Sequence, residues 1–193
     1  MRPWLLVPLA ALAVAGCGGT TTVTQTETVS HTITVRVTTT TQGSQPGAGA
    51  TACTGDAMTG SFTVIPGSPG AGQIGYKLRV TNASPVACYV SGLPNAQLLS
   101  SAGHDLPTNV VAAQPGTATA ARIVLQPNAA ATADARFSPD IPGGSEPTDA
   151  PCEPKSFTLR LGFGGAPLDV NVSPPTPVCE HGTLQFSLFS AAG

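Results

Sequence analysis

The chain has 193 residues, with eight lysines and arginines against ten aspartates and glutamates. Charged residues make up 9% of it, against about 25% in a typical soluble domain. No basic stripe is present to neutralise phosphates, so we exclude nucleic acid as a partner. The 22 glycines and 19 prolines predict a chain rich in turns.

Residues 1–16 have the three parts of a secretory signal peptide. Arg2 supplies the positive start, an apolar run follows, and Ala15-Gly16 supplies the small residues before Cys17. A membrane-spanning helix needs about 20 apolar residues, and this run is shorter and contains Pro8. We therefore expect a signal peptide that is cleaved rather than a transmembrane helix.

The end of this run, Val14-Ala15-Gly16-Cys17, resembles the lipobox of bacterial lipoproteins. In a lipobox the cysteine sulfur receives a diacylglyceryl group, and cleavage makes that cysteine the first residue. The resemblance implies that lipid on Cys17 holds the protein on the extracytoplasmic face of the cell membrane. Each buried methylene contributes about 0.8 kcal/mol, so two acyl chains anchor firmly. An ordinary signal peptide followed by a chance cysteine is the alternative.

Residues 17–52 have the composition of a linker. Twelve of the 22 residues between Thr20 and Thr41 are threonine, and a stretch punctuated by glycine and proline follows. Such a segment buries too little apolar surface to offset its conformational entropy, which predicts a solvated stalk, with glycosylation of its threonines left open. Val and Ile alternate with polar residues over 28–37, however, and a docked or self-pairing strand there remains the alternative.

Residues 53–193 carry the alternation of short strands separated by turns. Its clearest example is the stretch in which Tyr76, Leu78 and Val80 alternate with polar residues. The pattern predicts strands at 61–64, 76–81, 87–90, 96–99, 110–112, 118–125, 129–137, 156–161, 167–172 and 183–189. Many short strands without intervening helices predict an all-β chain with a single immunoglobulin-like β-sandwich of antiparallel strands. This length suffices for one well-buried core, hence one domain.

The cysteine count agrees with a lipidated Cys17. It leaves an even set in a compartment where disulfides persist, namely Cys53, Cys88, Cys152 and Cys179. Three pairings are open, and nearest pairing closes the shortest loops, each stabilising the fold by about 3.5 to 4 kcal/mol. The alternative is a metal site built from these thiols and His181, which lacks the usual pair of cysteines two residues apart.

Several short motifs occur together in this region, in consistent order and spacing. They are Cys53, Gly70-Ala71-Gly72, Tyr76-x-Leu78, Asn82-x-Ser84, Cys88, Gly92-x-Pro94, Leu125-x-Pro127, Cys152-x-Pro154 and Cys179-x-x-Gly182. Over residues 52–190 the chain resembles the two-disulfide domain of unknown function that is common in secreted lipoproteins of actinobacteria. Asn128 and Phe137 stand where that pattern often has glycine and tryptophan. The resemblance implies a lipidated, disulfide-paired, β-rich protein and brings no catalytic residues.

Two patterns suggest chemistry that their surroundings do not support. The glycines of residues 70–75 fit the spacing of a dinucleotide-binding loop, but a strand follows instead of a helix, so we expect a hairpin turn and no cofactor. His104 and Asp105 suggest a hydrolase, but no nucleophile elbow is present and a solvated loop is the simpler interpretation. We expect His181 to cap the approach to a disulfide rather than act as a base.

The longest irregular segment of the domain, residues 138–155, is acidic. Its carboxylates are Asp140, Glu146, Asp149 and Glu153. Carboxylate oxygens on a loop are calcium ligands, but the spacing matches no calcium loop, so these are weak candidates and solubility is the alternative role. Long irregular loops often carry function.

We therefore expect an envelope lipoprotein with a non-enzymatic binding or interaction module, whose partner is a protein, a wall polymer or a small ligand. The alternative is an extracytoplasmic enzyme or accessory factor with an unrecognised site.

Overall fold

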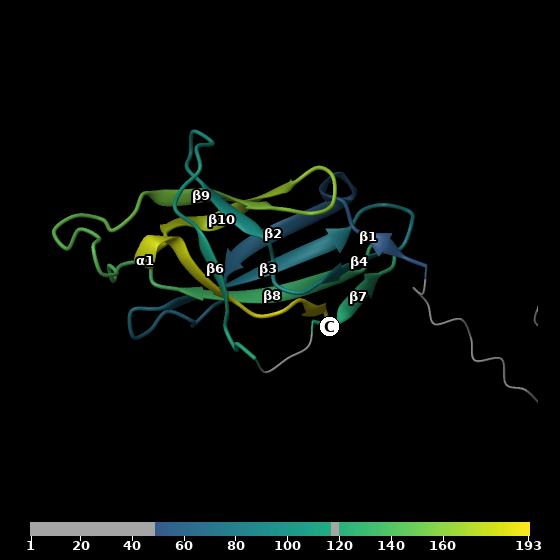
Figure 1. Cartoon of the computed structure of the whole chain (residues 1–193), viewed down its shortest axis with the longest axis horizontal. Coiled ribbons are helices and arrows are strands. Elements are labelled where there is room, and N and C mark those ends of the chain that lie inside the picture. The colour runs from purple at the N-terminus through teal and green to yellow at the C-terminus, as the bar shows by residue number, and fades with distance from the viewer. Residues whose placement is uncertain (1–48, 117–119) are drawn as a thin grey trace, which may run out of the picture. The chain divides into compact units, whose positions relative to one another are not determined.

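The computed structural model describes residues 49–116 and 120–193, coloured in Figure 1. The signal peptide, Cys17 and the alternating segment 28–37 lie outside these residues, so the structure does not address those predictions. Pro46–Gly193 forms one compact unit.

The described residues form twelve strands and two short helical turns. They are β1 (Thr51–Ala52), η1 (Gly55–Ala57), β2 (Met58–Val64), β3 (Ile74–Asn82), β4 (Cys88–Ser91), β5 (Ala96–Leu99), β6 (Asn109–Ala112), β7 (Arg122–Leu125), β8 (Ala130–Phe137), β9 (Lys155–Leu161), β10 (Leu168–Pro177), α1 (Cys179–Gly182), β11 (Thr183–Phe186) and β12 (Ser190–Ala191).

The strands form two sheets. The larger has the order β5-β9-β10-β2-β3-β8-β11-β6, with β12 also paired to β8, and the smaller has the order β1-β4-β7. In Figure 1, β9, β10, β2, β3 and β8 follow one another from top to bottom, the smaller sheet lies at the right and α1 at the left. The predicted all-β sandwich with two disulfides is confirmed.

Strand direction differs in part from the prediction, which assumed antiparallel strands throughout. Among the described strands, β1–β4, β2–β10 and β6–β11 pair in parallel. A parallel pair needs a long connection that crosses to the other end of the strand, and about 70 residues separate β6 from β11. Local alternation predicts where most strands lie but not which distant strand pairs with each.

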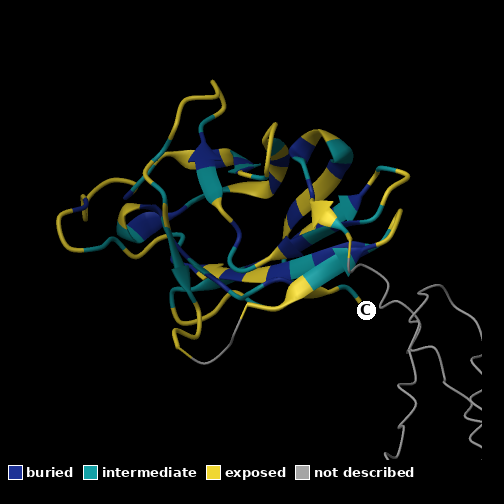
Figure 2. Cartoon of the chain, turned by 45° about the vertical axis from the view of Figure 1, so that its right-hand side comes forward, coloured by how far each residue is buried: buried dark blue, intermediate teal, exposed yellow. Residues whose placement is uncertain are grey.

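One core lies between the sheets, and Figure 2 shows the alternation of buried and exposed residues along the strands that enclose it. Phe62 and Tyr76 on neighbouring strands are fully buried, with ring centroids 5.0 Å apart. Tyr76 also packs on Phe137 of β8, at 5.2 Å. Tilted aromatic contacts of this kind add about 0.5–1.5 kcal/mol each to the burial of their surfaces.

Strand β10 extends beyond its predicted end at residue 172, through a segment with three prolines. Proline is tolerated where a ladder is interrupted, and the pairing of β10 with β9 shifts register between Asn171 and Thr176. The Tyr76 hydroxyl donates a hydrogen bond to the Pro174 carbonyl at 2.7 Å, which ties this segment to β3.

Asn82 connects the two sheets at the end of β3. Its fully buried side-chain amide donates hydrogen bonds to the carbonyls of Val86 and Leu125, the last residue of β7. Its oxygen accepts from the backbone N–H and the hydroxyl of Ser84. The Asn82-x-Ser84 motif therefore acts as a structural link, because every polar atom of the buried amide is paired.

Candidate functional site

The four domain cysteines form the two disulfides that nearest pairing predicts. Cys53 is bonded to Cys88, with 4.9 Å between their Cα atoms, and Cys152 is bonded to Cys179, with 5.5 Å. The first joins the segment after β1 to β4, and the second joins the acidic loop to α1. The alternative of a metal site built from these thiols is wrong, because all four sulfurs are in disulfides.

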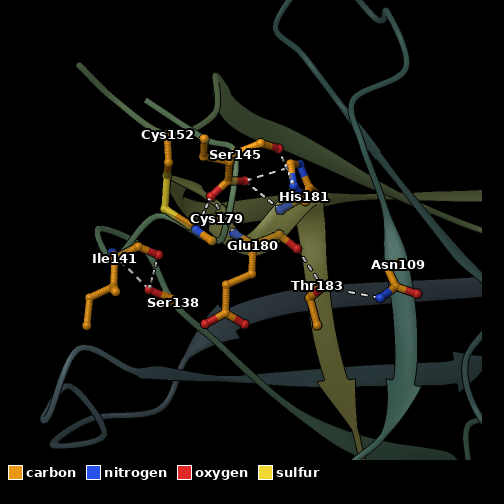
Figure 3. A network of polar contacts seen from close by, with 11 residues as sticks. Asn109, Ser138, Ile141, Ser145, Cys152, Cys179, Glu180, His181 and Thr183 are labelled. Carbon is orange, nitrogen blue, oxygen red and sulfur yellow. Dashed lines mark hydrogen bonds and ion pairs between the residues drawn. A yellow bond between two sulfur atoms is a disulfide. The ribbon is translucent and has the colours of Figure 1, made fainter. Parts of the chain in front are cut away.

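Figure 3 shows a network of polar contacts beside the second disulfide. In this network the carboxylate of Glu146 accepts three backbone hydrogen bonds. One carboxylate oxygen accepts hydrogen bonds from the backbone N–H groups of Gly143 and Glu180, at 2.6 and 2.9 Å. The other accepts from the backbone N–H of His181. Glu146 therefore fastens the acidic loop to α1 beside the Cys152–Cys179 disulfide.

The backbone of α1 is shaped to make these bonds. Glu180 and His181 both have φ of 56°, in the left-handed region that non-glycine residues rarely adopt. This conformation turns both N–H groups toward one carboxylate, as in the concave backbone arrangements that bind anions. Glu146 thus acts as an anion supplied by the chain itself.

The two glutamates of this region titrate in opposite directions. Burial alone would raise the pKa of Glu146, but the three N–H donors and the nearby His181 together hold that pKa below its ordinary value. The pKa of Glu153 is raised, first by burial and then by the negative charge of Glu146. Glu146 is therefore the carboxylate that stays ionised as pH falls.

The structure brings together only some of the predicted calcium candidates. Glu146, Glu153 and His181 offer ligand atoms within 4.8 Å of one another. Asp140 and Asp149 are exposed and belong to no such group among the residues that the structure describes. Histidine nitrogen is not a ligand that calcium prefers, and the oxygens of Glu146 already accept three hydrogen bonds.

His181 also lies between a hydroxyl and a carboxylate. Its Nε2 is 3.4 Å from the Ser145 hydroxyl, and its Nδ1 is 3.7 Å from a Glu146 oxygen. The order serine, histidine, acid is that of a nucleophilic triad, although both distances exceed those of a tight hydrogen bond. No motif marks Ser145, because it lies 36 residues before His181 in an irregular loop.

The two other candidate motifs lie in turns, as expected. Gly70 and Gln73 exchange two backbone hydrogen bonds at the tip of the β2–β3 hairpin. His104 and Asp105 are exposed in the loop after β5, where the His104 carbonyl accepts a hydrogen bond from the backbone N–H of Ser100.

A first concave surface of about 290 Å³ lies beside the Cys53–Cys88 disulfide. Its walls include Tyr89 of β4, Leu93 and Phe163. The guanidinium of Arg122 lies over the ring of Tyr89, 4.0 Å from its centre, in a cation–π contact.

A second concave surface, of about 450 Å³, lies against β8 and β11. It is lined by the base of the β2–β3 hairpin, by Ala113 after β6, and by polar side chains that include Arg136 and Gln185. The alternation of β8 predicts that Arg136 faces outward, but the facing residue on β11 follows only from the strand pairing. Its volume lies within the roughly 300–1,000 Å³ of small-molecule sites.

A family described as a domain of unknown function, DUF4232, matches residues 53–189. The chain belongs to the DUF4232 family. The DUF4232 domain begins at Cys53 and contains all four paired cysteines, the Glu146 network and the residues that line the surface at β8 and β11. No curated protein and no solved structure matches the chain. Within the part of the chain that the structure describes, no helix is long and apolar enough to cross a membrane.

Proposed function

We propose that this protein is a lipoprotein anchored on the extracytoplasmic face of the cell envelope, with the DUF4232 domain as a non-enzymatic binding module. The observation that carries the proposal is the use of the five cysteines. Four are paired within the domain, and the fifth, Cys17, ends the lipobox-like Val14-Ala15-Gly16-Cys17. Disulfides persist in the oxidising compartments to which a signal peptide leads.

The remaining chain suits this role. In the proposal, residues 1–16 are removed, Cys17 carries the lipid, and residues 18–50, which precede β1, form the threonine-rich spacer. Fully extended, a segment of that length reaches about 110 Å, enough to lift the domain well clear of a membrane. The lipobox-like Val14-Ala15-Gly16-Cys17 and the resemblance to a domain common in secreted lipoproteins of actinobacteria support a bacterial envelope as the location.

The anchoring test replaces Cys17 by Ser in the native cell. We expect the variant to leave the membrane fraction, whereas Gly18→Ala, which keeps the adjacent thiol, remains there. Mass spectrometry of the amino-terminal peptide should show a diacylglyceryl group on Cys17. Membrane association of Cys17→Ser that is equal to that of the wild type would overturn the proposed anchor.

The binding role rests on the two concave surfaces and the rigid frame around them. Each combines apolar walls with a few polar groups, which is the composition of ligand sites. The disulfides restrict the segments beside them and lower the entropy that binding would otherwise cost. Proximity labelling from the anchored protein would identify a protein partner, and the same labelling after Cys17→Ser is its matched control.

A second candidate function, hydrolysis, is favoured by the arrangement of Ser145, His181 and Glu146. An ionised carboxylate beside Nδ1 would favour the tautomer that carries its proton on Nδ1. In that tautomer Nε2 is free to accept the proton of the serine hydroxyl. A fluorophosphonate probe tests it directly. Labelling that Ser145→Ala abolishes and Ser101→Ala leaves intact would establish a nucleophile, and absence of labelling on the wild type would reject the hydrolase.

A further inference from the structure

The groove against β8 and β11 has an apolar wall above a polar floor. Ile65 and Ile74, at the two ends of the β2–β3 hairpin loop, form the wall on one side, and Ala113 lies on the other. The hairpin is held in place by Ser68, whose hydroxyl donates to the Gly75 carbonyl and accepts from the Gly75 N–H, both at 3.0 Å. The wall is therefore fixed before any ligand enters.

The floor of the groove contains one row of residues across three strands. Gly75 of β3 pairs with Arg136 of β8, and Arg136 pairs with Gln185 of β11. Directly paired residues project on the same face of a sheet, with Cβ atoms about 4.5–5.5 Å apart. Gly75 has no side chain, so no side chain of β3 stands next to Arg136 in this row. Ser68 and Ile65 of the hairpin lie over Gly75 instead.

In the next row of the same face, two residues along β3 and β8, the charged side chains are paired with each other. Lys77 is paired with Asp134 and forms an ion pair with it, and the Asp134 backbone N–H is bonded to the Ser187 hydroxyl. By contrast, within residues 49–116 and 120–193 the side chains of Arg136 and Gln185 have no hydrogen bond or ion pair to another protein group. Two adjacent donors thus point into the groove without an acceptor.

We propose that this groove binds a small carboxylate with a short, branched apolar body. The carboxylate would accept the forked N–H groups of Arg136 and the side-chain amide of Gln185, a geometry that guanidinium matches closely. The apolar body would pack against Ile65, Ile74 and Ala113. The inference rests on the proposed function of the domain as a binding module and names the ligand class of one surface.

Charge favours a carboxylate over a phosphate ester. The charged side chains that line the groove are Asp134 and Arg136, and Asp134 already forms an ion pair with Lys77, so Arg136 is the cation left for a ligand. A carboxylate brings one negative charge, whereas a phosphate monoester brings about 1.5 to 2 near pH 7. The second phosphate charge would lie beside Asp134 without a cation of its own.

The test uses the full chain carrying Cys17→Ser, which is free of lipid whatever the result of the anchoring experiment. Binding of 4-methylpentanoate is followed by backbone NMR shifts and by calorimetry. We expect shifts at Ile65, Ile74 and Gln185, and binding at least about tenfold weaker after Arg136→Gln or Gln185→Leu. Arg79→Gln, an exposed arginine on the same face of β3, is the matched control and should leave affinity within about twofold.

Two analogues make the outcome decisive. The neutral 4-methylpentanamide should bind at least about tenfold more weakly than 4-methylpentanoate. The phosphate ester 3-methylbutyl phosphate should also bind more weakly, because its second negative charge has no cation to meet. Equal binding of the amide, equal binding by Arg136→Gln, or tighter binding of the phosphate would each overturn the carboxylate site. Acetyl-glycyl-leucine distinguishes the two sources of such a carboxylate. Binding as tight as that of 4-methylpentanoate indicates the carboxyl terminus of a peptide, and weaker binding indicates a free acid. Failure of every probe would reject this groove and leave the anchored module to be tested through its labelled partners.

Discussion

Asn82 and Leu125 lie 43 residues apart in the chain, yet the side-chain amide of Asn82 donates a hydrogen bond of 3.0 Å to the Leu125 carbonyl. The bond joins β3 of the larger sheet to β7 of the smaller one. It lies in the interior, where an unpaired polar group costs about 1–3 kcal/mol. The two sheets are thus connected by a polar contact as well as by the apolar core.

Replacing Asn82 by Ala removes the amide donor to the Leu125 carbonyl and one of two donors to the Val86 carbonyl, and it creates a small cavity. We expect the free energy of unfolding in urea to fall by about 2–4 kcal/mol with both disulfides intact. Asn109→Ala, which removes one exposed contact with Thr183, is the control and should cost less than about 0.5 kcal/mol. A loss no larger than that of the control would show that the link contributes little.

Glu146→Gln should destabilise the domain in a pH-dependent way. The pKa of Glu146 is below its ordinary value in the folded protein, so its stabilisation is fully present above the ordinary glutamate pKa and is lost as pH falls through the lowered one. At pH 7 we expect a loss of about 1–3 kcal/mol, narrowing toward zero in strong acid. Thermal unfolding of the wild type and of Glu146→Gln across pH 2–8 measures this difference in stability, with the exposed Asp149→Asn as the control. A difference that does not depend on pH would contradict the stabilising role of the ionised Glu146.

The two disulfides should stabilise the fold to a similar extent. Their sequence separations are 35 and 27 residues, for which the chain-entropy relation gives about 3.8 and 3.6 kcal/mol. We therefore expect the double alanine variant at Cys53 and Cys88 to lose slightly more unfolding free energy than that at Cys152 and Cys179. Non-reducing peptide mapping of the wild type provides the connectivity, and any cross-linkage between the pairs would refute it.

Calcium should leave the melting temperature of the domain nearly unchanged. The Glu146 oxygens accept backbone N–H groups that a calcium ion would have to displace, while Asp140 and Asp149 lie apart from that group. Differential scanning calorimetry with calcium, with magnesium and with chelator checks this. A rise of several degrees that depends on calcium concentration and is absent in Glu146→Gln would restore the predicted acidic site.

Strand positions could be predicted because alternation is a local property. The stretch around Tyr76, Leu78 and Val80 has its polar partners on the opposite face, and the strand predicted at 96–99 coincides with β5. The predicted 183–189 strand instead ends at Phe186 as β11, because the chain leaves β8 there, and it pairs with β8 again only in β12 from Ser190. Such a break depends on the neighbouring strand.

The candidate sites were less predictable, because they depend on contacts between distant segments. The acidic loop drew attention to Glu146, but its role follows from the backbone of Glu180 and His181, whose left-handed conformation has no sequence signal as clear as a glycine. The pairing of Arg136 with Gln185 likewise requires the register of β8 and β11. Nearest pairing of the cysteines succeeded because short loops cost least entropy to close.

The first disulfide determines how mechanical load enters the domain. Strand β1 is held to β4 by only two residue pairs, so tension on the preceding chain would peel it away readily. The next residue, Cys53, is covalently joined to Cys88, and the load therefore passes into β4, the middle strand of the smaller sheet. A pull from the amino-terminal side is thus resisted by a covalent bond and by the shearing of a paired strand, whereas reduction of that bond would direct the same force along η1 into β2 and the core.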